Sequence, residues 1–210
     1  MRIVCISDTH NQQRKEWFPQ IPDGDVLVHA GDATIAGTIP EIVGFNAWLG
    51  TLPHKHKIFV AGNHDWLFQT DPSLADGLLT NAIYLQDSGV TINNAKFYGS
   101  PWQPAFQGWA FNLPRGEKLR LKWDLIPNET DVLITHGPPE GIRDWTFQGE
   151  HVGCRDLWQN IQGRLALRAH IFGHIHHAYG YSPINGTQFV NASICDEAYR
   201  GIREPIVIEI

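Results

Sequence analysis

Side chains that are able to bind metal ions follow five short apolar segments of the sequence. The segments lie far apart in the chain, but each is followed directly by His, Asp or Asn. These residues are Asp8, His10, Asp32, Asn63, His64, Asp65, His136, His174 and His176. Imidazole nitrogens with carboxylate and amide oxygens, and without thiolate, suit first-row ions such as Mn²⁺, Fe²⁺ or Fe³⁺, Zn²⁺ and Co²⁺. The residue types therefore predict a shared metal site.

The number of candidates indicates two metal ions. A single catalytic Zn²⁺ needs only about three protein ligands. Two ions about 3.5–4 Å apart, bridged by one carboxylate, would use the larger set. Such a pair lowers the pKa of a bound water, so that hydroxide attacks near neutral pH, and neutralises phosphoryl oxygens. We therefore expect a dinuclear phosphoesterase.

Each of these residues also has a structural explanation when it is considered alone. A single Asp or Asn after a strand usually satisfies backbone groups of a turn. A single His is more often a hydrogen-bonded structural residue than a ligand. These explanations do not predict His, Asp and Asn at all five segment ends, so the shared site accounts for more of the pattern.

The apolar segments predict buried strands. The strands that precede the candidate ligands are expected at 2–7, 25–30, 57–61, 131–135 and 169–172. Helices are expected at 39–50, 115–126 and 153–168, and further strands near 82–86, 89–92, 95–99, 178–184, 187–190 and 205–210. This order indicates a layered α/β fold, in which the residues after neighbouring strands meet in one crevice.

Composition limits the number of domains and the partners. The chain has 210 residues, 42% of them hydrophobic, and we take residues 1–210 as one domain. A net charge of −6 with 16 Lys and Arg gives no basic stripe for extended nucleic-acid contact. No segment has the length of a membrane span or a signal peptide. Because Cys5, Cys154 and Cys195 are too few for a disulfide framework, we expect a cytoplasmic protein.

Five motifs in a fixed order resemble those of the calcineurin-like metallophosphoesterase superfamily. They are "DTH", "GD", "GNHD", "THG" and "GHIH", they span residues 8 to 176, and each follows a predicted strand. The ordered group is specific, whereas "GD" or "THG" alone would carry no information. The segments between them resemble the metallophosphoesterase-domain-containing branch, especially "GFNAWLGTLP", "LLTNAIYLQDSGVTI", "YGSPWQPAFQGWAFNLPRGEKL" and "LITHGPPEGIRDW".

The resemblance implies a fold and a role for each candidate. The fold would be a four-layer α-β-β-α sandwich with two central β-sheets, and Asp32 would bridge two metal ions. The other ligands of the first ion would be Asp8, His10 and His176. Those of the second would be Asn63, His136 and His174. His64 would contact the phosphoryl oxygen and protonate the leaving alkoxide, while Asp65 would orient its imidazole and keep it cationic.

Departures from the wider superfamily narrow the function. In serine/threonine protein phosphatases an arginine that binds phosphate directly precedes one of these motifs, and the second motif continues as a longer acidic-basic signature. Here Ala61 precedes Gly62, and "GDATIAG" follows the second strand. A protein phosphatase is therefore disfavoured. Some members of the branch have glycine in place of His174, which should weaken the second metal site. This chain keeps the histidine, so we expect a fully active enzyme.

These features predict a phosphodiesterase that hydrolyses cyclic nucleotides or small phosphodiesters, a preference that comes from the resemblance. A phosphomonoesterase or nucleotide pyrophosphatase is the alternative among enzymes, and a scaffold without turnover is the alternative from another class. The retained motif residues favour an enzyme over a scaffold. A small phosphate ester, a nucleotide in particular, is the expected partner, without membrane contact.

Two features near the motifs had two interpretations each. The aromatic stretch that contains Trp102 and Trp109 either packs the sheets and loops or reaches the crevice and stacks on a nucleobase, and we expect packing. Arg143 and Asp144 form either a surface ion pair or a contact to substrate, and we expect the ion pair.

The segment "IFGHIHH" raises the question of which histidines bind metal. In an extended segment His174 and His176 point to the same side, about 6–7 Å apart along the chain. That spacing suits one histidine for each of two adjacent ions. His177 would point away and serve as a structural neighbour.

Overall fold

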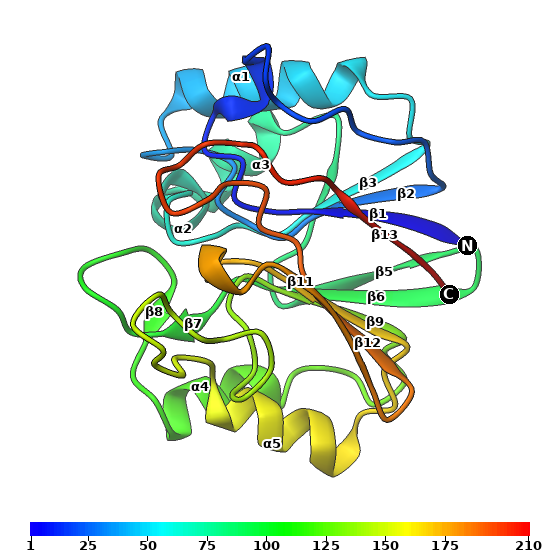
Figure 1. Cartoon of the computed structure of the whole chain (residues 1–210), viewed down its shortest axis with the longest axis vertical. Helices are drawn as coiled ribbons and strands as arrows, with labels where there is room; N and C mark the ends of the chain where they lie inside the picture. The colour runs from blue at the N-terminus through cyan, green and yellow to red at the C-terminus, as the bar shows by residue number, and fades with distance from the viewer.

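Helices cover both outer faces of two stacked β-sheets. The computed structural model describes residues 1–210. Its α-helices are α1 (Ile39–Thr51), α2 (Leu67–Thr70), α3 (Pro72–Leu78), α4 (Glu117–Trp123) and α5 (Arg155–Arg164). Figure 1 shows α1, α2 and α3 above the sheets and α4 and α5 below them. The predicted four-layer α-β-β-α sandwich is therefore confirmed.

The first sheet carries the first three motifs. In spatial order its strands are β13 (Ile206–Glu209), β1 (Arg2–Ile6), β2 (Val26–His29), β3 (His56–Phe59) and β4 (Ile83–Tyr84). Strands β1 to β4 are parallel, and β13 pairs antiparallel with β1. Ile6 is opposite His29, and His29 is opposite Phe59. Because β1, β2 and β3 end level with one another, the residues that follow them start from the same edge.

The second sheet carries the last two motifs. In spatial order its strands are β11 (Gly180–Ile184), β12 (Thr187–Asn191), β10 (Ala169–Phe172), β9 (Val132–Thr135), β6 (Ala95–Ser100) and β5 (Ser88–Ile92). The four central strands are parallel, and β11 and β5 are antiparallel edge strands. A short parallel pair, β7 (Gln103–Pro104) and β8 (Asn112–Leu113), lies outside both sheets.

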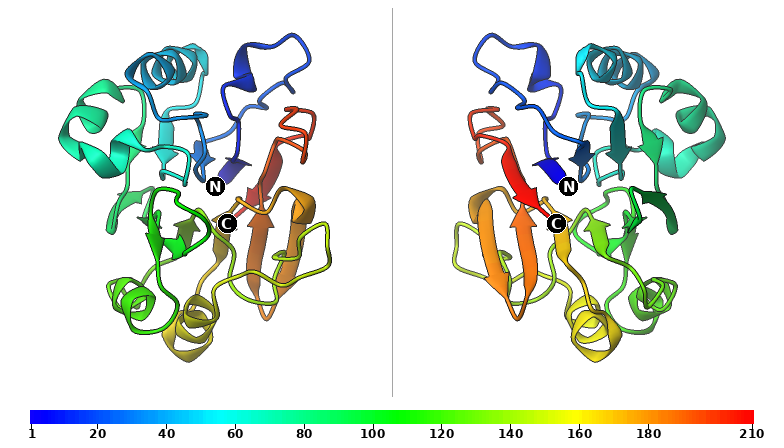
Figure 2. Two further views of the ribbon diagram at one scale, coloured as in Figure 1. Left: turned by 90° about the vertical axis from the view of Figure 1, so that its left-hand side faces the viewer. Right: turned by 90° about the vertical axis from the view of Figure 1, so that its right-hand side faces the viewer.

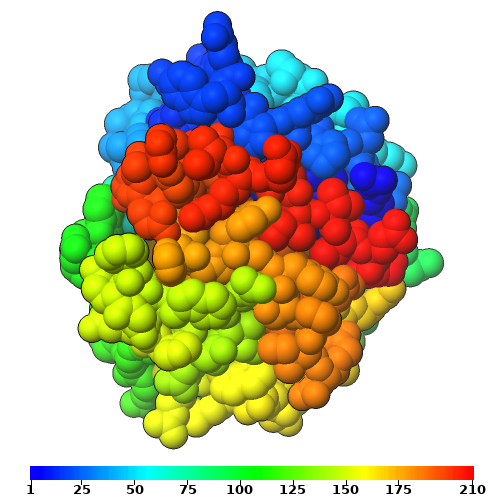
Figure 3. Space-filling view, in the orientation of Figure 1, coloured from blue at the N-terminus to red at the C-terminus, as the bar shows by residue number.

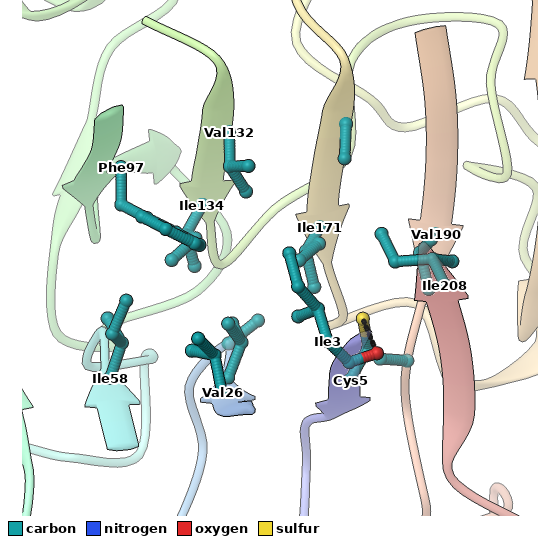
Figure 4. Close-up of a cluster of buried hydrophobic side chains, with 14 of the residues drawn as sticks. Ile3, Cys5, Val26, Ile58, Phe97, Val132, Ile134, Ile171, Val190 and Ile208 are labelled. Carbon is teal, nitrogen blue, oxygen red and sulfur yellow. Dashed lines mark hydrogen bonds between the residues drawn. The ribbon is translucent and has the colours of Figure 1, made fainter. Parts of the chain in front are cut away.

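The two sheets meet in a core of 18 buried residues, most of them Val, Ile or Ala. Figure 4 shows Ile3, Val26 and Ile58 of the first sheet facing side chains such as Ile134 and Ile171 of the second. Strands covered on both faces are expected to be continuously apolar, as these are. Two further clusters pack the helices against the outer faces.

The predicted elements are largely confirmed. All three predicted helices and all eleven predicted strands are present, with ends that differ by a few residues. Helices α2 and α3, the short 3₁₀ helices and the β7–β8 pair were not predicted. Both chain ends lie at the right-hand edge of the molecule in Figure 1 and next to each other in the turned views of Figure 2, and Met1 N donates to Ile210 O over 2.7 Å. No helix combines the length and apolar character that a membrane crossing requires.

Candidate metal centre

The carboxyl ends of five strands bring all seven predicted metal ligands together. Asp8 and His10 follow β1, Asp32 follows β2, and Asn63 follows β3. His136 follows β9, and the last two predicted ligands follow β10. These strand ends face left in Figure 1, where the loops of both sheets meet. The site therefore lies across the join between the two sheets.

The backbone around the site is unusual for residues with side chains. Four of the seven predicted ligands have a positive φ, namely Asp8 (54°), His10 (41°), Asp32 (56°) and His174 (67°). Such left-handed conformations cost free energy in residues other than glycine and are concentrated at functional sites. The surrounding fold must therefore hold these side chains in place.

The motif glycines are needed because the carboxylates pack against the backbone. A Cβ at Gly62 would lie 2.2 Å from Asp32 Oδ1, and one at Gly173 would lie 2.1 Å from Asp8 Oδ2. Both distances are far below van der Waals contact. Glycine in "GNHD" and "GHIH" thus gives the neighbouring ligand room.

The first predicted ligand group is assembled as expected. Potential ligand atoms of Asp8, His10 and His176 all lie within 4.8 Å of one another. His176 Nε2 is 3.4 Å from Asp8 Oδ1 and 3.3 Å from His10 Nε2. Asp8 is buried and also accepts hydrogen bonds from Ser193 Oγ (2.7 Å) and from the backbone N–H of His174 (3.0 Å). These donors hold the carboxylate in one orientation.

The second group is assembled beside the first. Potential ligand atoms of Asp32, His136 and His174 also lie within 4.8 Å of one another. Asn63 Oδ1 is 3.0 Å from His136 Nε2. Asp32 Oδ2 lies 3.3 Å from His136 Nε2 in this group and 3.8 Å from His10 Nε2 in the first. Asp32 therefore lies between the groups, where a bridging carboxylate must be.

Backbone carbonyl groups fix the orientation of three imidazole rings. The Nδ1 atoms of His10, His136 and His176 lie 3.2, 2.9 and 2.9 Å from the carbonyl oxygens of Thr34, Ala30 and Asp196. Each Nδ1 is therefore placed to donate its proton, which leaves Nε2 of the neutral ring as the atom that can bind a metal. Metal-binding histidines commonly have this arrangement, in which one ring nitrogen donates and the other binds.

The charges of the site favour a cation. In neutral His10 and His176 the Nε2 lone pairs face one another over 3.3 Å without a donor between them, and a cation there would satisfy both. The nearby imidazoles hold the pKa of Asp32 and that of Asp8 well below the usual range, despite burial. Burial lowers the pKa of His136, but the charge and hydrogen bond of Asp32 outweigh this and raise it to about 9. Nitrogen and oxygen donors without thiolate fit the predicted first-row ions.

His64 lies at the same cluster, with its ring held from three sides. Its backbone N–H donates to Asp32 Oδ1 (2.8 Å), and its Nδ1 donates to the Ile35 carbonyl (2.7 Å). Trp109 stacks on the imidazole at a centroid distance of 4.2 Å, and His10 meets it edge-on at 4.8 Å. His10, Asp32 and His64 form a third group whose potential ligand atoms lie within 4.8 Å of one another, so His64 stands directly beside the predicted ligands. Its Nε2 has no hydrogen-bond partner within the protein and is the nitrogen available to a substrate.

The prediction that Asp65 orients the His64 imidazole is wrong. The Asp65 carboxylate accepts from the backbone N–H groups of Gly62 (2.8 Å), Asp32 (2.9 Å) and Thr34 (3.0 Å), and from Thr34 Oγ1 (2.7 Å). Burial and the charge of Asp32 raise its pKa to about 6, against the effect of these donors. Asp65 thus ties the loops after β2 and β3 together, and the Ile35 carbonyl orients His64.

A cleft of about 520 Å³ opens over the cluster. Its lining includes a rim of aromatic side chains and six site residues, which are His10, Asp32, Asn63, His64, His174 and His176. Phe106 (52% exposed) and Phe147 (77% exposed) belong to that rim, as do Trp109 and Tyr199. In Figure 3 the red-orange segment near the C-terminus lies above the yellow-green segment around residue 150 on the side where the cleft opens. This volume is typical of a small-molecule site.

The two tryptophans of the aromatic stretch have different places. Trp102 Nε1 donates to Asp87 Oδ2 (2.8 Å), and the ring meets Phe111 edge-on, so the preferred packing interpretation is confirmed for it. Trp109 lines the cleft beside His64, which agrees with the alternative interpretation.

Arg143 and Asp144 do not form the predicted ion pair. Arg143 donates to Ser182 Oγ (2.8 Å) and to the carbonyl of Tyr181 (2.6 Å). Asp144 is fully buried and accepts from the backbone N–H of Gly141 (2.9 Å) and from His151 Nδ1 (2.6 Å). Each side chain forms its hydrogen bonds with a different part of the chain, so the two do not pair.

The predicted extended conformation of residues 174–176 is also wrong. His174 has a left-handed φ of 67°, and His176 begins the 3₁₀ helix η2 (His176–Ala178). The two histidines nevertheless lie in different ligand groups, as predicted, because the turn directs them apart. His177 lies outside both groups and pairs with Glu197 Oε1 at 3.0 Å.

Sequence patterns missed several contributors to the site. Tyr199, Phe147 and Ser193 lie outside every motif. The carbonyl groups that orient the imidazoles belong to residues whose side chains give no signal. Only the structure shows that these residues converge on the cluster.

Comparison with known proteins agrees with the geometry. A family model described as calcineurin-like phosphoesterase matches residues 1–178. The chain belongs to this family. It is 46% identical over 233 residues to metallophosphoesterase domain-containing protein 1 of Homo sapiens and of Mus musculus, covering 100% of this chain and 71% of each relative. A Caenorhabditis elegans UPF0046 protein is 39% identical over 229 residues, covering 100% of this chain and 81% of that protein.

Membership of the calcineurin-like phosphoesterase family and the geometry of the ligand groups support the same general function. The sequence-based assignment to the metallophosphoesterase-domain-containing branch is confirmed by the relatives. The clustered His and Asp side chains fit the metal ions that such an enzyme needs. The chain is a metal-dependent phosphoesterase.

Proposed function

We propose that the protein is a dinuclear phosphodiesterase that hydrolyses cyclic nucleotides or small phosphodiesters. The observation that carries the proposal is the pair of adjoining ligand groups that share Asp32 at the floor of an aromatic-rimmed cleft. The first ion would be held by Asp8, His10, Asp32 and His176. The second would be held by Asp32, Asn63, His136 and His174. Mn, Fe and Zn all match these donors.

The side chains of the cleft have different roles in such a reaction. When bound, the ions supply Lewis acidity that makes hydroxide available near neutral pH and offsets the negative charge of the phosphate. His64, fixed through Nδ1 by the Ile35 carbonyl, presents Nε2 and protonates the leaving oxygen. Trp109 keeps this ring in place from its other face.

The rim supports a substrate with a flat ring. Trp109, Phe106 and Phe147 come from two loops, and two of them expose more than half of their surface. Stacking of a base on an aromatic side chain contributes on the order of 1–3 kcal/mol. A cyclic nucleotide would place its phosphate at the ligand groups and its base against this rim.

A substrate panel tests the proposal. Purified protein with Mn²⁺ is assayed against cyclic AMP, cyclic GMP, bis(4-nitrophenyl) phosphate and AMP, with the metal-chelated protein as control. We expect hydrolysis of the diesters and little release of phosphate from AMP. Faster hydrolysis of AMP would identify a phosphomonoesterase, and hydrolysis of none would favour a scaffold.

We also propose that the protein acts in the cytoplasm. Its three cysteines are free and buried, which is consistent with a reducing compartment. Cell fractionation with detection of the protein in the cytosolic fraction tests this proposal, and recovery outside that fraction would contradict it.

A further inference from the structure

Tyr199 is held over the candidate metal centre in a strained conformation. Its φ is 58°, a left-handed value that a bulky aromatic residue adopts only when its surroundings impose it. Strain of this kind is concentrated where a side chain has to occupy a particular position. The conformation of Tyr199 therefore calls for an explanation in terms of the site.

A network around Asp196 imposes the conformation. Asp196 Oδ1 accepts from the backbone N–H groups of Ala198 (3.0 Å) and Arg200 (2.9 Å), and Oδ2 accepts from Arg200 Nε (2.8 Å). The backbone N–H of Tyr199 donates to the Asp196 carbonyl, which also accepts from His176 Nδ1 at 2.9 Å. The turn that carries Tyr199 is thus tied directly to a predicted metal ligand.

The ring of Tyr199 touches the site from its open side. It meets His10 edge-on at a centroid distance of 4.7 Å and His176 at 5.4 Å, and His64 lies at 6.2 Å. Tyr199 lines the cleft and is 43% exposed. No side chain or backbone group of the protein hydrogen-bonds its hydroxyl group. The hydroxyl group is therefore not used within the protein and is available to a ligand in the cleft.

We propose that the Tyr199 hydroxyl group donates a hydrogen bond to a phosphoryl oxygen of the ester bound at the candidate metal centre. This role rests on the proposed function, because it requires that phosphate binds there. It makes Tyr199 a catalytic residue that acts beside His64. The hydroxyl group keeps its proton throughout and stabilises charge on the oxygen that it contacts. The Asp196 network positions Tyr199 for this contact.

Tyr199→Phe removes the hydroxyl group and keeps the ring. The metal-loaded variant should bind inorganic phosphate about tenfold or more weakly than the wild type in isothermal titration calorimetry, the usual effect of losing a hydrogen bond to a charged group. Its kcat/KM for a diester should fall by a similar factor or more. Its Tm and its metal content by elemental analysis should be unchanged.

A matched control and a double variant separate this role from a structural one. Tyr181→Phe removes the hydroxyl group of a similarly exposed tyrosine that donates to Gln188 Oε1 away from the cleft, and should change nothing measured at the site. Asp196→Ala should weaken phosphate binding like Tyr199→Phe. The variant with both changes should be no weaker than Asp196→Ala alone, because both act through one contact.

The outcomes are distinct. Phosphate affinity of Tyr199→Phe within twofold of the wild type, or loss of its metal, would overturn the proposed contact. If the wild type binds phosphate but hydrolyses no ester, the proposed function fails while the phosphate measurement still decides the role of Tyr199. If the wild type hydrolyses a diester but binds no inorganic phosphate, the kcat/KM of Tyr199→Phe decides the role of Tyr199, and an unchanged value would overturn it.

Discussion

At the scale of single residues, replacing neighbouring side chains of the cleft should have different effects on metal content and on turnover. His64→Ala removes an imidazole that belongs to neither of the predicted ligand sets. We expect near-normal metal content by elemental analysis and turnover of a diester slower by roughly 10²–10⁴, the range for loss of a general acid. His177→Ala is the matched control, because His177 lines the cleft without joining a ligand group. Equal activity of His64→Ala and wild type would remove His64 from the mechanism.

The ion pair between His136 and Asp32 should contribute stability to the metal-free protein that is lost as the pH rises. The pKa of His136 is raised to about 9 in the folded chain, against about 6.5 in an unfolded one. Its contribution to stability is therefore complete below pH 6.5 and is lost as the pH rises through about 9. Burial lowers the pKa values of His10 and His174 to about 4 and about 3, so both rings are neutral in the folded chain but partly protonated in the unfolded one near pH 6.5, which acts in the opposite direction.

Urea unfolding in EDTA at pH 6.5 and 8.5 measures the effect. The contribution of His136 to the free energy of unfolding should fall by about 2 kcal/mol between these values, and the difference between wild type and His136→Gln isolates it. His136→Gln should remove this part of the slope and leave the contribution of His176, whose pKa burial lowers but the hydrogen bond and charge of Asp8 raise by more. An equal slope in His136→Gln would contradict the assignment.

At the scale of elements, the glycine that follows β10 should be as necessary as the ligands around it. A Cβ at Gly173 would lie 2.1 Å from Asp8 Oδ2 and 2.2 Å from Ser7 Oγ. Gly173→Ala should therefore destabilise the protein by about 1–3 kcal/mol and reduce metal content, as overpacking does. Gly163→Ala in α5 is the control, with no atom within 4 Å of the added Cβ, and should stabilise by about 0.5–1 kcal/mol. Thermal unfolding and elemental analysis of both variants test this contrast.

The elements that the sequence predicted best are those whose pattern has a single physical cause. Strands such as β1 and β9 are short, apolar and buried on both faces, and their ends located every predicted ligand. Helices α2 and α3 were missed because their seven or fewer residues contain no full amphipathic repeat. The turn at His174 was missed because a positive φ in histidine has no sequence signature. Partners such as the Ile35 carbonyl depend on backbone position, which side-chain chemistry does not reveal.

At the scale of the whole molecule, the predicted metals would join the two sheets. The first sheet supplies ligands through the loops after β1, β2 and β3, and the second through those after β9 and β10. Binding to the folded state alone raises stability by about 2.7 kcal/mol at 100 times Kd, which corresponds to roughly 5–10 °C in Tm for a chain of this size.

Calorimetry with Mn²⁺ and with EDTA measures this rise in Tm, and a single transition is expected if residues 1–210 form one domain. Asp32→Ala should lose both metals together and show no rise in Tm with Mn²⁺. Elemental analysis that finds one metal at full occupancy in this variant would contradict the bridging role of Asp32.

The order of strands along the chain gives this arrangement a further consequence. Apart from β13, residues up to Tyr84 build the first sheet and residues from Ser88 build the second. A chain severed between 84 and 88 would therefore yield two fragments, each with an incomplete set of ligands. Hydrolysis of a chromogenic diester should be absent from either fragment and return when they are mixed. Activity at the metal centre would then measure the reassembly of the two fragments. The pairing of β13 with β1 would hold the second fragment to the first.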